Sequence, residues 1–317
     1  MTYSEIWHRI ATSYDDGEAR AIARILIEEL FGLSYADIVC GATEQLSADD
    51  TLRLDTAVRR IEQGEPLQHV LGYADFCGNR FSVNGSVLIP RSETEWLVDE
   101  GAKLMDGCIA SDETQHKAPH SPKHILDIGT GSGCIAISLK LRLGDAYVEA
   151  WDISEEALRT AQDNADALKA EVVFRKRDAL VSSAPTEQAM DSINYSEANI
   201  LAAPWDLIVS NPPYICDSER SAMDDNVLLH EPHTALFVPD DDPLRFYRAI
   251  ARYALLTLNI GGSLLFECNT RYAEATGTML SDMGFEEVTV SDDCFNLPRF
   301  VRGRKNSPSQ PSPSGRA

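Results

Sequence analysis

The chain is poor in several features that mark specialised classes of protein. Its seven cysteines are scattered from Cys40 to Cys294 and include no Cys-x-x-Cys pair. An odd, dispersed set disfavours both a disulfide framework and a zinc site, so we expect reduced thiols and no metal. No run of 18 apolar residues is present, so we expect no membrane-spanning helix. Met1 to Trp7 lack the basic and then apolar pattern of a secretion signal, which favours a cytoplasmic protein.

Positive charge is also scarce. The 28 Lys and Arg residues stand against 50 Asp and Glu residues, which gives a net charge of −22. Stable binding to nucleic acid needs cationic side chains that displace the counterions of the phosphate backbone, so this balance disfavours it. An acidic surface suits a basic protein partner instead. With 317 residues, 44% of them apolar, the chain can form one large or two modest domains.

The most informative segment is Asn211-Pro212-Pro213-Tyr214, which directly follows the apolar run 205–210. Proline has no backbone N–H, so two in succession end a strand, and each restricts the residue before it to extended conformations. The segment therefore predicts a stiff loop that holds a short amide and an aromatic ring in fixed relation. Such a loop can bind a planar NH2 group, because oxygens accept its hydrogens while the ring covers its flat face. This favours chemistry on an amide or amino nitrogen.

A second motif upstream predicts a strand, a glycine-rich turn and a helix in succession. The turn is Gly129-Thr130-Gly131-Ser132-Gly133. Its glycines permit unusual backbone angles and let a ligand approach the backbone closely. About 20 residues later, Asp152 ends another predicted strand, where a carboxylate can accept hydrogen bonds from both hydroxyls of a ribose. Together these features predict a nucleoside cofactor, and the glycine spacing differs from the G-x-G-x-x-G of dinucleotide-binding dehydrogenases.

Strands and helices are predicted to alternate after residue 123. The strands are expected near 124–129, 147–152, 171–177, 205–210, 262–268, 286–291 and 299–304, and the helices near 134–143, 154–169, 243–258 and 270–283. Alternation of this kind builds a mostly parallel, seven-stranded α/β sheet covered on both faces, with ligands at the carboxyl ends of its strands. The glycine turn, Asp152, Asp178 and Asn211 all fall at such ends.

The sequence before the sheet predicts two further parts. Residues 1–72 carry apolar residues at helical spacing and form a small helical domain, a candidate for docking the substrate. Residues 73–106 are expected to hold a hairpin around Asn84-Gly85 and a connecting helix that ends near Met105. Ser92 and Glu95 fit a capping box that opens this helix.

The sheet domain is predicted to cover residues 107–306. Two polar segments in this part of the chain, 106–122 and 181–203, have the composition of a linker and of an inserted loop. The Pro- and Ser-rich tail 307–317 is expected to be disordered.

These motifs together resemble a known family. The glycine turn with its preceding strand, Asp152 and the Asn211–Tyr214 loop are similar to the S-adenosylmethionine-dependent methyltransferases that modify planar nitrogens. Three other segments are similar to the peptide chain release factor N5-glutamine methyltransferase family: Glu65–Gly72, Leu88–Glu95, and Glu231-Pro232 followed by Ala235-Leu236. The resemblance extends from about Glu18 to Arg304.

The resemblance implies a Rossmann-like methyltransferase that acts on the glutamine amide in the Gly-Gly-Gln loop of release factors and so modulates translation termination. It implies S-adenosyl-L-methionine as cofactor. Charge and composition predict no stable nucleic-acid or membrane partner, and a monomer is the simplest expectation for the oligomeric state. The implied cofactor-binding residues are Gly129, Thr130, Gly131, Ser132, Gly133, Asp152, Asp178, Ala179 and Asn211. The implied substrate-binding residues are Asn211, Pro212, Pro213 and Tyr214, of which Asn211, Pro212 and Tyr214 are the expected catalytic residues.

Three positions depart from the family pattern. The family often has an aromatic residue after the aspartate of the third strand, where this chain has Ala179. It usually has a glycine where this chain has Asn269, and a glycine-containing stretch where this chain has Phe295–Arg299. We expect these changes to affect the adenine pocket and the rim of the site rather than the central assignment.

Two other functions remain open from the sequence. Asn-Pro-Pro-Tyr also occurs in adenine and guanine methyltransferases, whose targets are planar amines as well. The net charge of −22 and the lack of a basic, aromatic-rich domain count against nucleic acid. A catalytically silent cofactor-binding protein is the other alternative, and detectable methyl transfer would exclude it.

Overall fold

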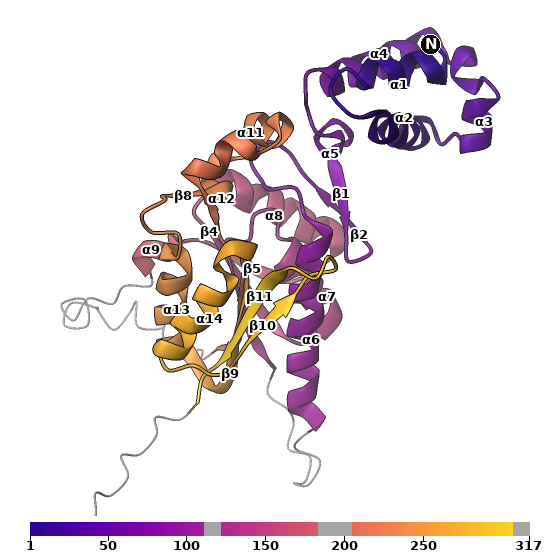
Figure 1. The fold of residues 1–317 in the computed structure, drawn as a ribbon. Coiled ribbons are helices and arrows are strands. Elements are labelled where there is room, and N and C mark those ends of the chain that lie inside the picture. Colours follow the sequence, from indigo (N-terminus) through magenta and orange to yellow (C-terminus); the bar gives the residue numbers. More distant parts are fainter. Residues whose placement is uncertain (111–121, 183–204, 307–317) are drawn as a thin grey trace, which may run out of the picture.

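The apolar runs after residue 123 form a seven-stranded sheet in the computed structural model, which describes residues 1–110, 122–182 and 205–306 (Figure 1). The strand order is β10-β11-β9-β6-β3-β4-β5. The strands are β3 (His124–Ile128), β4 (Tyr147–Asp152), β5 (Val172–Lys176), β6 (Trp205–Ser210), β9 (Leu258–Glu267), β10 (Glu286–Asp292) and β11 (Pro298–Arg304). All pairs from β5 to β9 are parallel, and β11 is antiparallel to both its neighbours. The predicted mostly parallel α/β fold is confirmed.

Helices cover both faces of this sheet because its central strands are apolar on both sides. The covering helices are α6 (Glu95–Ala110), α7 (Cys134–Leu143), α8 (Glu155–Leu168), α13 (Arg245–Thr257) and α14 (Ala273–Asp282). Along β6, Leu207 and Val209 pack with α6 and α7, whereas Ile208 between them packs with α13 and α14. Burial of both faces fixes the strand register, so the carboxyl ends of the parallel strands share one edge.

The predicted helical N-terminal region is also confirmed. Its elements are α1 (Tyr3–Ile10), α2 (Asp16–Phe31), α3 (Tyr35–Val39), the 3-10 helix η1 (Ala42–Gln45), α4 (Ala48–Glu62) and α5 (Leu67–Leu71). They share a core of their own, which includes Ile6, Leu26 and Val58. Arg9 ties α1 to α4, because its guanidinium lies 2.7 Å from both Asp55 and Glu62.

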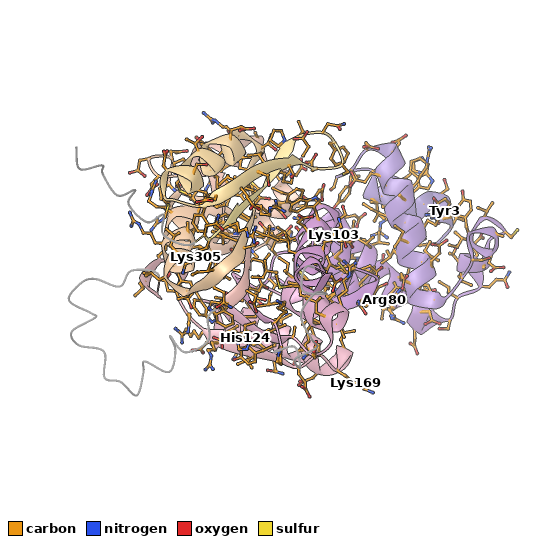
Figure 2. All side chains as sticks on the ribbon, turned by 90° about the horizontal axis from the view of Figure 1, so that it is seen from below. Tyr3, Arg80, Lys103, His124, Lys169 and Lys305 are labelled. Atoms are coloured by element: carbon orange, nitrogen blue, oxygen red, sulfur yellow. The ribbon has the colours of Figure 1, made fainter. Side chains whose placement is uncertain are left out.

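These N-terminal helices lie to one side of the sheet and reach it through α5 and a short hairpin (Figure 1). The hairpin consists of β1 (Tyr73–Phe76) and β2 (Asn79–Ser82). Arg80 on β2 lies between the two parts (Figure 2). Its guanidinium is 3.1 Å from the Glu29 carboxylate of α2, and it stacks 4.2 Å from the centre of the Tyr73 ring.

The position of this hairpin corrects the sequence prediction. We expected its turn at Asn84-Gly85, but the turn is Cys77-Gly78, and the described residues 83–91 contain no strand. Cys77 and Gly78 both have positive φ, 48° and 74°, as a two-residue hairpin loop requires. Asn84 instead accepts the Ser86 N–H with its side-chain oxygen at 2.9 Å, which forms a local turn that no strand follows.

The predicted capping box at the start of α6 is wrong as well. Residues Ser92–Thr94 form a 3-10 turn, η2, and the Ser92 hydroxyl contacts Glu93 rather than capping the helix. Glu95 accepts the Cys77 N–H at 2.7 Å, so its carboxylate holds the hairpin turn against the start of α6. The helix then runs to Ala110, five residues beyond the predicted end.

The chain between β6 and α13 forms elements that the sequence did not predict. They are β7 (Ile215–Cys216), η4 (Asp217–Ala222), α11 (Asp225–His230), α12 (His233–Leu236) and β8 (Phe237–Val238), with β7 and β8 paired in parallel. The short helix α9 (Ala179–Ser182) occupies the start of the predicted insertion. The rest of that insertion, most of the predicted linker and the predicted disordered tail lie outside the described residues. Within the described ranges, every helix is too short or too polar to cross a membrane.

Candidate active site at the carboxyl edge of the sheet

Four strands bring three groups of predicted site residues and one further carboxylate, Glu267, to one edge. The glycine turn follows β3, Asp152 ends β4, Asn211 follows β6 and Glu267 ends β9. The Gly131 N–H donates to the Asp152 carboxylate at 2.9 Å. A Cβ at Gly129 would lie 3.9 Å from the Asn211 carbonyl oxygen. The glycine turn therefore contacts both the predicted ribose-binding acid and the Asn-Pro-Pro-Tyr loop.

The glycine turn has the backbone that its sequence predicts. Gly129, Gly131 and Gly133 have φ values of 78°, 54° and 82°, a region that side chains rarely enter. A Cβ at Gly131 would meet no described atom within 4 Å, which leaves open space for a ligand. One at Gly133 would lie 2.8 Å from Ile137 and 3.1 Å from Ala161. Gly131 thus permits a ligand to approach, and Gly133 permits α7 to pack closely on α8.

The turn is also held from below by Asp127, which the sequence analysis did not select. Its carboxylate accepts the Thr130 hydroxyl at 2.7 Å, and its other oxygen makes no hydrogen bond within the described residues. Burial raises the pKa of Asp127 to about 7. Asp127 interrupts the apolar run of β3 between Leu126 and Ile128, and this buried polar position was the signal that could have identified it.

Asp152 presents a largely buried carboxylate at the end of β4. One oxygen accepts the Gly131 N–H and the other accepts the Ser154 N–H, each at 2.9 Å. Burial raises the pKa of Asp152, while these N–H donors oppose that effect. The next residue, Ile153, is 54% exposed and offers an apolar surface beside the carboxylate. An acid next to an exposed apolar side chain suits a ribose joined to a planar base.

Asp178 and Ala179 also lie at this edge. The Arg177 N–H donates to the Asp152 carbonyl oxygen at 2.9 Å, which brings the chain after β5 beside β4. The Asp178 carboxylate accepts the Leu180 N–H at 2.8 Å. Ala179 is half-buried against the apolar cluster around α13. Ala179 offers no aromatic ring, and Ile153 is an exposed apolar side chain at the same edge. The cofactor role of Asp178 and Ala179 stays a prediction.

The Asn-Pro-Pro-Tyr loop is held by two residues from distant segments. The Asn211 amide nitrogen lies 3.4 Å from the Thr94 hydroxyl, which donates to Glu267 at 2.7 Å. The Tyr214 hydroxyl donates to the other oxygen of the same carboxylate at 3.2 Å. Thr94 lies in η2, and Glu267 ends β9. Spacing along the chain gave no signal that joins these two residues to Asn211.

The carboxylate at the base of the Asn-Pro-Pro-Tyr loop, that of Glu267, is buried. Glu267 is 1% exposed. Burial raises the pKa of Glu267. The Thr94 hydroxyl, the Arg299 guanidinium and the Tyr214 hydroxyl lower it, but their effect is smaller. Burial and the neighbouring Glu267 charge raise the pKa of Tyr214 as well, so this phenol stays neutral. Arg299 itself is paired with Asp293 at 2.7 Å.

The departure from the family pattern at Asn269 has a local role. Its amide nitrogen lies 3.1 Å from the Glu219 carboxylate and 3.4 Å from the Tyr214 carbonyl oxygen. Its side-chain oxygen accepts the Arg271 N–H at 3.0 Å, which caps the turn after β9. The asparagine therefore joins β9 to the end of the Asn-Pro-Pro-Tyr loop, a contact that a glycine could not make.

Two segments that carry the family resemblance also meet near this site. Glu231 is 4% exposed, and its carboxylate accepts the Ile89 N–H at 3.2 Å. The Arg91 guanidinium lies 2.5 Å from the same carboxylate. This contact positions η2, and with it Thr94, against the chain that follows α11. No group of three or more His, Cys, Asp or Glu side chains able to hold a metal ion occurs in the ranges that the structure describes.

The sheet order and the residues at its carboxyl edge define a class I methyltransferase, a Rossmann-like fold whose glycine turn contacts the strand-end acid Asp152 and lies beside the Asn-Pro-Pro-Tyr loop. Comparison with known proteins narrows the class. The model of the PrmC N-terminal domain matches residues 8–72, and that of ribosomal protein L11 methyltransferase (PrmA) matches residues 105–215.

Curated relatives cover nearly the whole chain. Release factor glutamine methyltransferase from Bacteroides thetaiotaomicron is 40% identical over 292 residues, which are 92% of this chain and 95% of that protein. The protein of the same description from Flavobacterium psychrophilum is 34% identical over 297 residues, with 92% and 94% covered. The chain therefore belongs to the release factor glutamine methyltransferase family, which confirms the resemblance found from its motifs.

Proposed function

We propose that this protein transfers the methyl group of S-adenosyl-L-methionine to the side-chain amide nitrogen of a glutamine in peptide chain release factors. The observation that carries the proposal is the approach of the glycine turn to the Asn-Pro-Pro-Tyr loop, where Gly129 faces the Asn211 carbonyl oxygen. A cofactor on the turn and an amide on the loop would therefore be neighbours. The family membership of the chain supports glutamine in a release factor as the target.

The residues at the sheet edge fit the proposed cofactor. The open space above Gly131 accepts its methionine part, and the Asp152 carboxylate can accept bonds from its ribose hydroxyls. Ile153, Asp178 and Ala179 would surround the base. When bound, S-adenosylmethionine supplies an electrophilic methyl group whose sulfur departs as a neutral thioether, so the reaction needs no metal ion.

The Asn-Pro-Pro-Tyr loop supplies the activation of the nucleophile. An amide nitrogen is a poor nucleophile because its lone pair is delocalised into the carbonyl group. If the Asn211 side-chain oxygen and the Pro212 carbonyl accept its two N–H bonds, electron density on the nitrogen rises and its direction is fixed. Tyr214, whose hydroxyl donates to Glu267, would pack against the plane of the target amide beside Pro213. The nitrogen gains one bond to carbon and releases one of its two protons to water.

Positioning accounts for most of the expected rate enhancement. Holding two reactants in the correct geometry lowers a barrier by up to ~7–11 kcal/mol. A single preorganised polar contact contributes on the order of 3 kcal/mol. Asn211 and Pro212 supply both effects, since the same two hydrogen bonds polarise the amide and aim it.

The test is methyl transfer from labelled S-adenosylmethionine to a purified release factor. The same factor with its target glutamine replaced is the matched control, and duplex DNA and transfer RNA are parallel substrates. We expect label on the factor only when that glutamine is present. Label on nucleic acid alone would assign the function to the base-methyltransferase alternative, and no transfer to any substrate would favour a silent cofactor-binding protein. The proposal places the enzyme in the cytoplasm as a monomer.

A further inference from the structure

Two buried side chains extend a hydrogen-bonded chain from Asn211, which is itself partly exposed, beneath the candidate substrate loop. The Asn211 amide nitrogen contacts the Thr94 hydroxyl oxygen at 3.4 Å, and the Thr94 hydroxyl contacts a Glu267 oxygen at 2.7 Å. Thr94 is 3% exposed and Glu267 is 1% exposed, so water does not compete for the bond between them. The three residues come from the loop after β6, from η2 and from the end of β9.

The direction of each bond in this chain follows from the number of available hydrogens. The Thr94 and Tyr214 hydroxyls and the Arg299 guanidinium favour the ionised form of Glu267 against its burial. With Glu267 ionised, its carboxylate only accepts, so the single hydroxyl hydrogen of Thr94 is donated to it. The Tyr214 hydroxyl donates to the second oxygen of the carboxylate at 3.2 Å. The Thr94 oxygen can then only accept from Asn211, which must present its NH2 group to Thr94. The Asn211 side-chain oxygen is left on the opposite side of the amide.

We infer that Thr94 and Glu267 are positioning residues that fix which way round the Asn211 amide lies. The inference rests on the proposed function, in which the Asn211 oxygen accepts a hydrogen from the target amide. The two ends of an asparagine amide have nearly the same shape, and a half-turn about its last bond exchanges them. With the amide reversed, an NH2 group would face the NH2 group of the substrate, and neither could accept.

A reversed amide has a recognisable kinetic effect. Substrate binds only to the fraction of enzyme with the correct orientation, so its apparent affinity falls by that fraction. The bound complex has the correct geometry, so turnover changes much less than the KM for the release factor. Complete removal of the Asn211 amide would instead lower turnover. The two outcomes separate a positioning residue from a catalytic one.

Glu267→Gln tests the direction of the chain without changing its shape. The Tyr214 hydroxyl holds the oxygen of the new amide, so the NH2 group of the new amide faces Thr94. Thr94 then accepts from residue 267 and donates to the Asn211 oxygen, which reverses Asn211. If one hydrogen bond separates the two orientations of the Asn211 amide in energy, the KM for the release factor should rise by about 10-fold. Turnover and the dissociation constant of S-adenosylmethionine should change little.

Removing the Thr94 hydroxyl should restore part of the substrate affinity that Glu267→Gln loses. Thr94→Val keeps the size of the side chain but has no hydroxyl. The orientation of the Asn211 amide then no longer depends on which group residue 267 presents. The double variant Glu267→Gln with Thr94→Val should therefore have a lower KM than Glu267→Gln alone. Thr94→Ser keeps the hydroxyl and should behave like the wild type. Thr257→Val, which removes a buried helix hydroxyl away from the site, is the control for stability.

The experiment measures KM and turnover for a purified release factor, together with S-adenosylmethionine affinity and the unfolding temperature of each variant. The inference would be overturned if the double variant had the same KM as Glu267→Gln alone. It would also be overturned if, in the presence of Glu267→Gln, Thr94→Val and Thr94→Ser gave the same KM. Failure of the proposed function is a separate result, since the wild-type enzyme would then transfer no methyl group to the glutamine. In that case the side-chain NH2 signals of Asn211, followed by nuclear magnetic resonance, still test whether Glu267→Gln reverses the amide.

Discussion

At the scale of the residue, Asn211 has the most specific role in the proposed reaction. Asn211→Ala removes the oxygen that accepts a substrate hydrogen but leaves the Pro212 carbonyl in place. We expect turnover to fall by about 10²–10³-fold, as for the loss of one preorganised donor or acceptor. The dissociation constant of S-adenosylmethionine should change much less. An equal loss of both properties would make Asn211 a cofactor residue instead.

Asp152 is expected to act on the cofactor rather than on turnover. Asp152→Asn keeps one oxygen for the Gly131 N–H but loses the charge that strengthens hydrogen bonds to ribose hydroxyls. We expect the dissociation constant of S-adenosylmethionine to rise by about 10–100-fold. Isothermal titration calorimetry gives this value directly. Unchanged affinity would remove the ribose role from Asp152.

Alanine variants at two glycines of the turn should differ in their effects: one mainly on the free energy of unfolding, the other mainly on cofactor binding. Gly133→Ala places a methyl group 2.8 Å from Ile137 at a φ of 82°, so the free energy of unfolding should fall by about 1–3 kcal/mol. Gly131→Ala shares the backbone strain, with a φ of 54°, but meets no steric clash, so its free energy of unfolding should fall less, while its methyl group fills the space proposed for the cofactor. Urea unfolding and cofactor titration of both variants test this contrast. Equal effects on stability would contradict it.

At the scale of the element, the sequence predicted the strands better than the connections. The ends of β3, β4 and β6 lie within one residue of the prediction, because apolar runs buried on both faces have sharp limits. The start of β9 was placed four residues late, since Gly261-Gly262 resembles a turn. In the structure a Cβ at Gly262 would lie 3.1 Å from the Trp205 carbonyl oxygen, so this glycine allows β6 and β9 to approach closely.

The same distinction applies to the site. The glycine turn, Asp152 and Asn211 were predictable because each directly follows a strand whose end the sequence marks. Thr94 and Glu267 were not selected, because they meet across 173 residues of chain. The hairpin was misplaced because Asn84-Gly85 is the commoner turn signal, whereas Cys77 adopts a positive φ that its side chain does not favour.

The corrected hairpin leads to a prediction about Glu95. Its carboxylate accepts the Cys77 N–H at 2.7 Å and joins the turn of the hairpin to α6. Glu95→Ala should lower the free energy of unfolding by about 1–2 kcal/mol, since the partly buried Cys77 N–H loses its charged partner. Glu156→Ala is the matched control, because that carboxylate is exposed. Urea unfolding of the two variants is the measurement, and equal losses would contradict the role given to Glu95.

At the scale of the whole molecule, stability should depend on pH through Asp127. Its pKa is about 7 in the folded protein against 3.8 when unperturbed, so between these values the native state keeps a proton that the unfolded state has lost. The free energy of unfolding should therefore fall as the pH rises through this window, by on the order of 2–4 kcal/mol.

Asp127→Asn tests the source of this pH dependence, because an amide has no charge to bury at any pH. The variant should show a flatter plot of unfolding free energy against pH than the wild type, measured by urea unfolding from about pH 5 to about pH 8. A plot equally steep in the variant would assign the dependence to Asp152 or Glu267, the other buried carboxylates at this edge.

The contact between Thr94 and Glu267 limits how this fold can be reused. Sheet domains of this kind invite transplantation, in which residues 107–306 would be cut out and fused to a new recognition module. Such a chimera would retain the glycine turn, Asp152 and the Asn-Pro-Pro-Tyr loop, yet it would lack Thr94. The Glu267 carboxylate would keep the Tyr214 hydroxyl but lose that of Thr94, and the Asn211 amide would lose the contact that orients it. An engineer who wishes to redirect this enzyme should therefore place the graft upstream of η2 rather than at the start of the sheet.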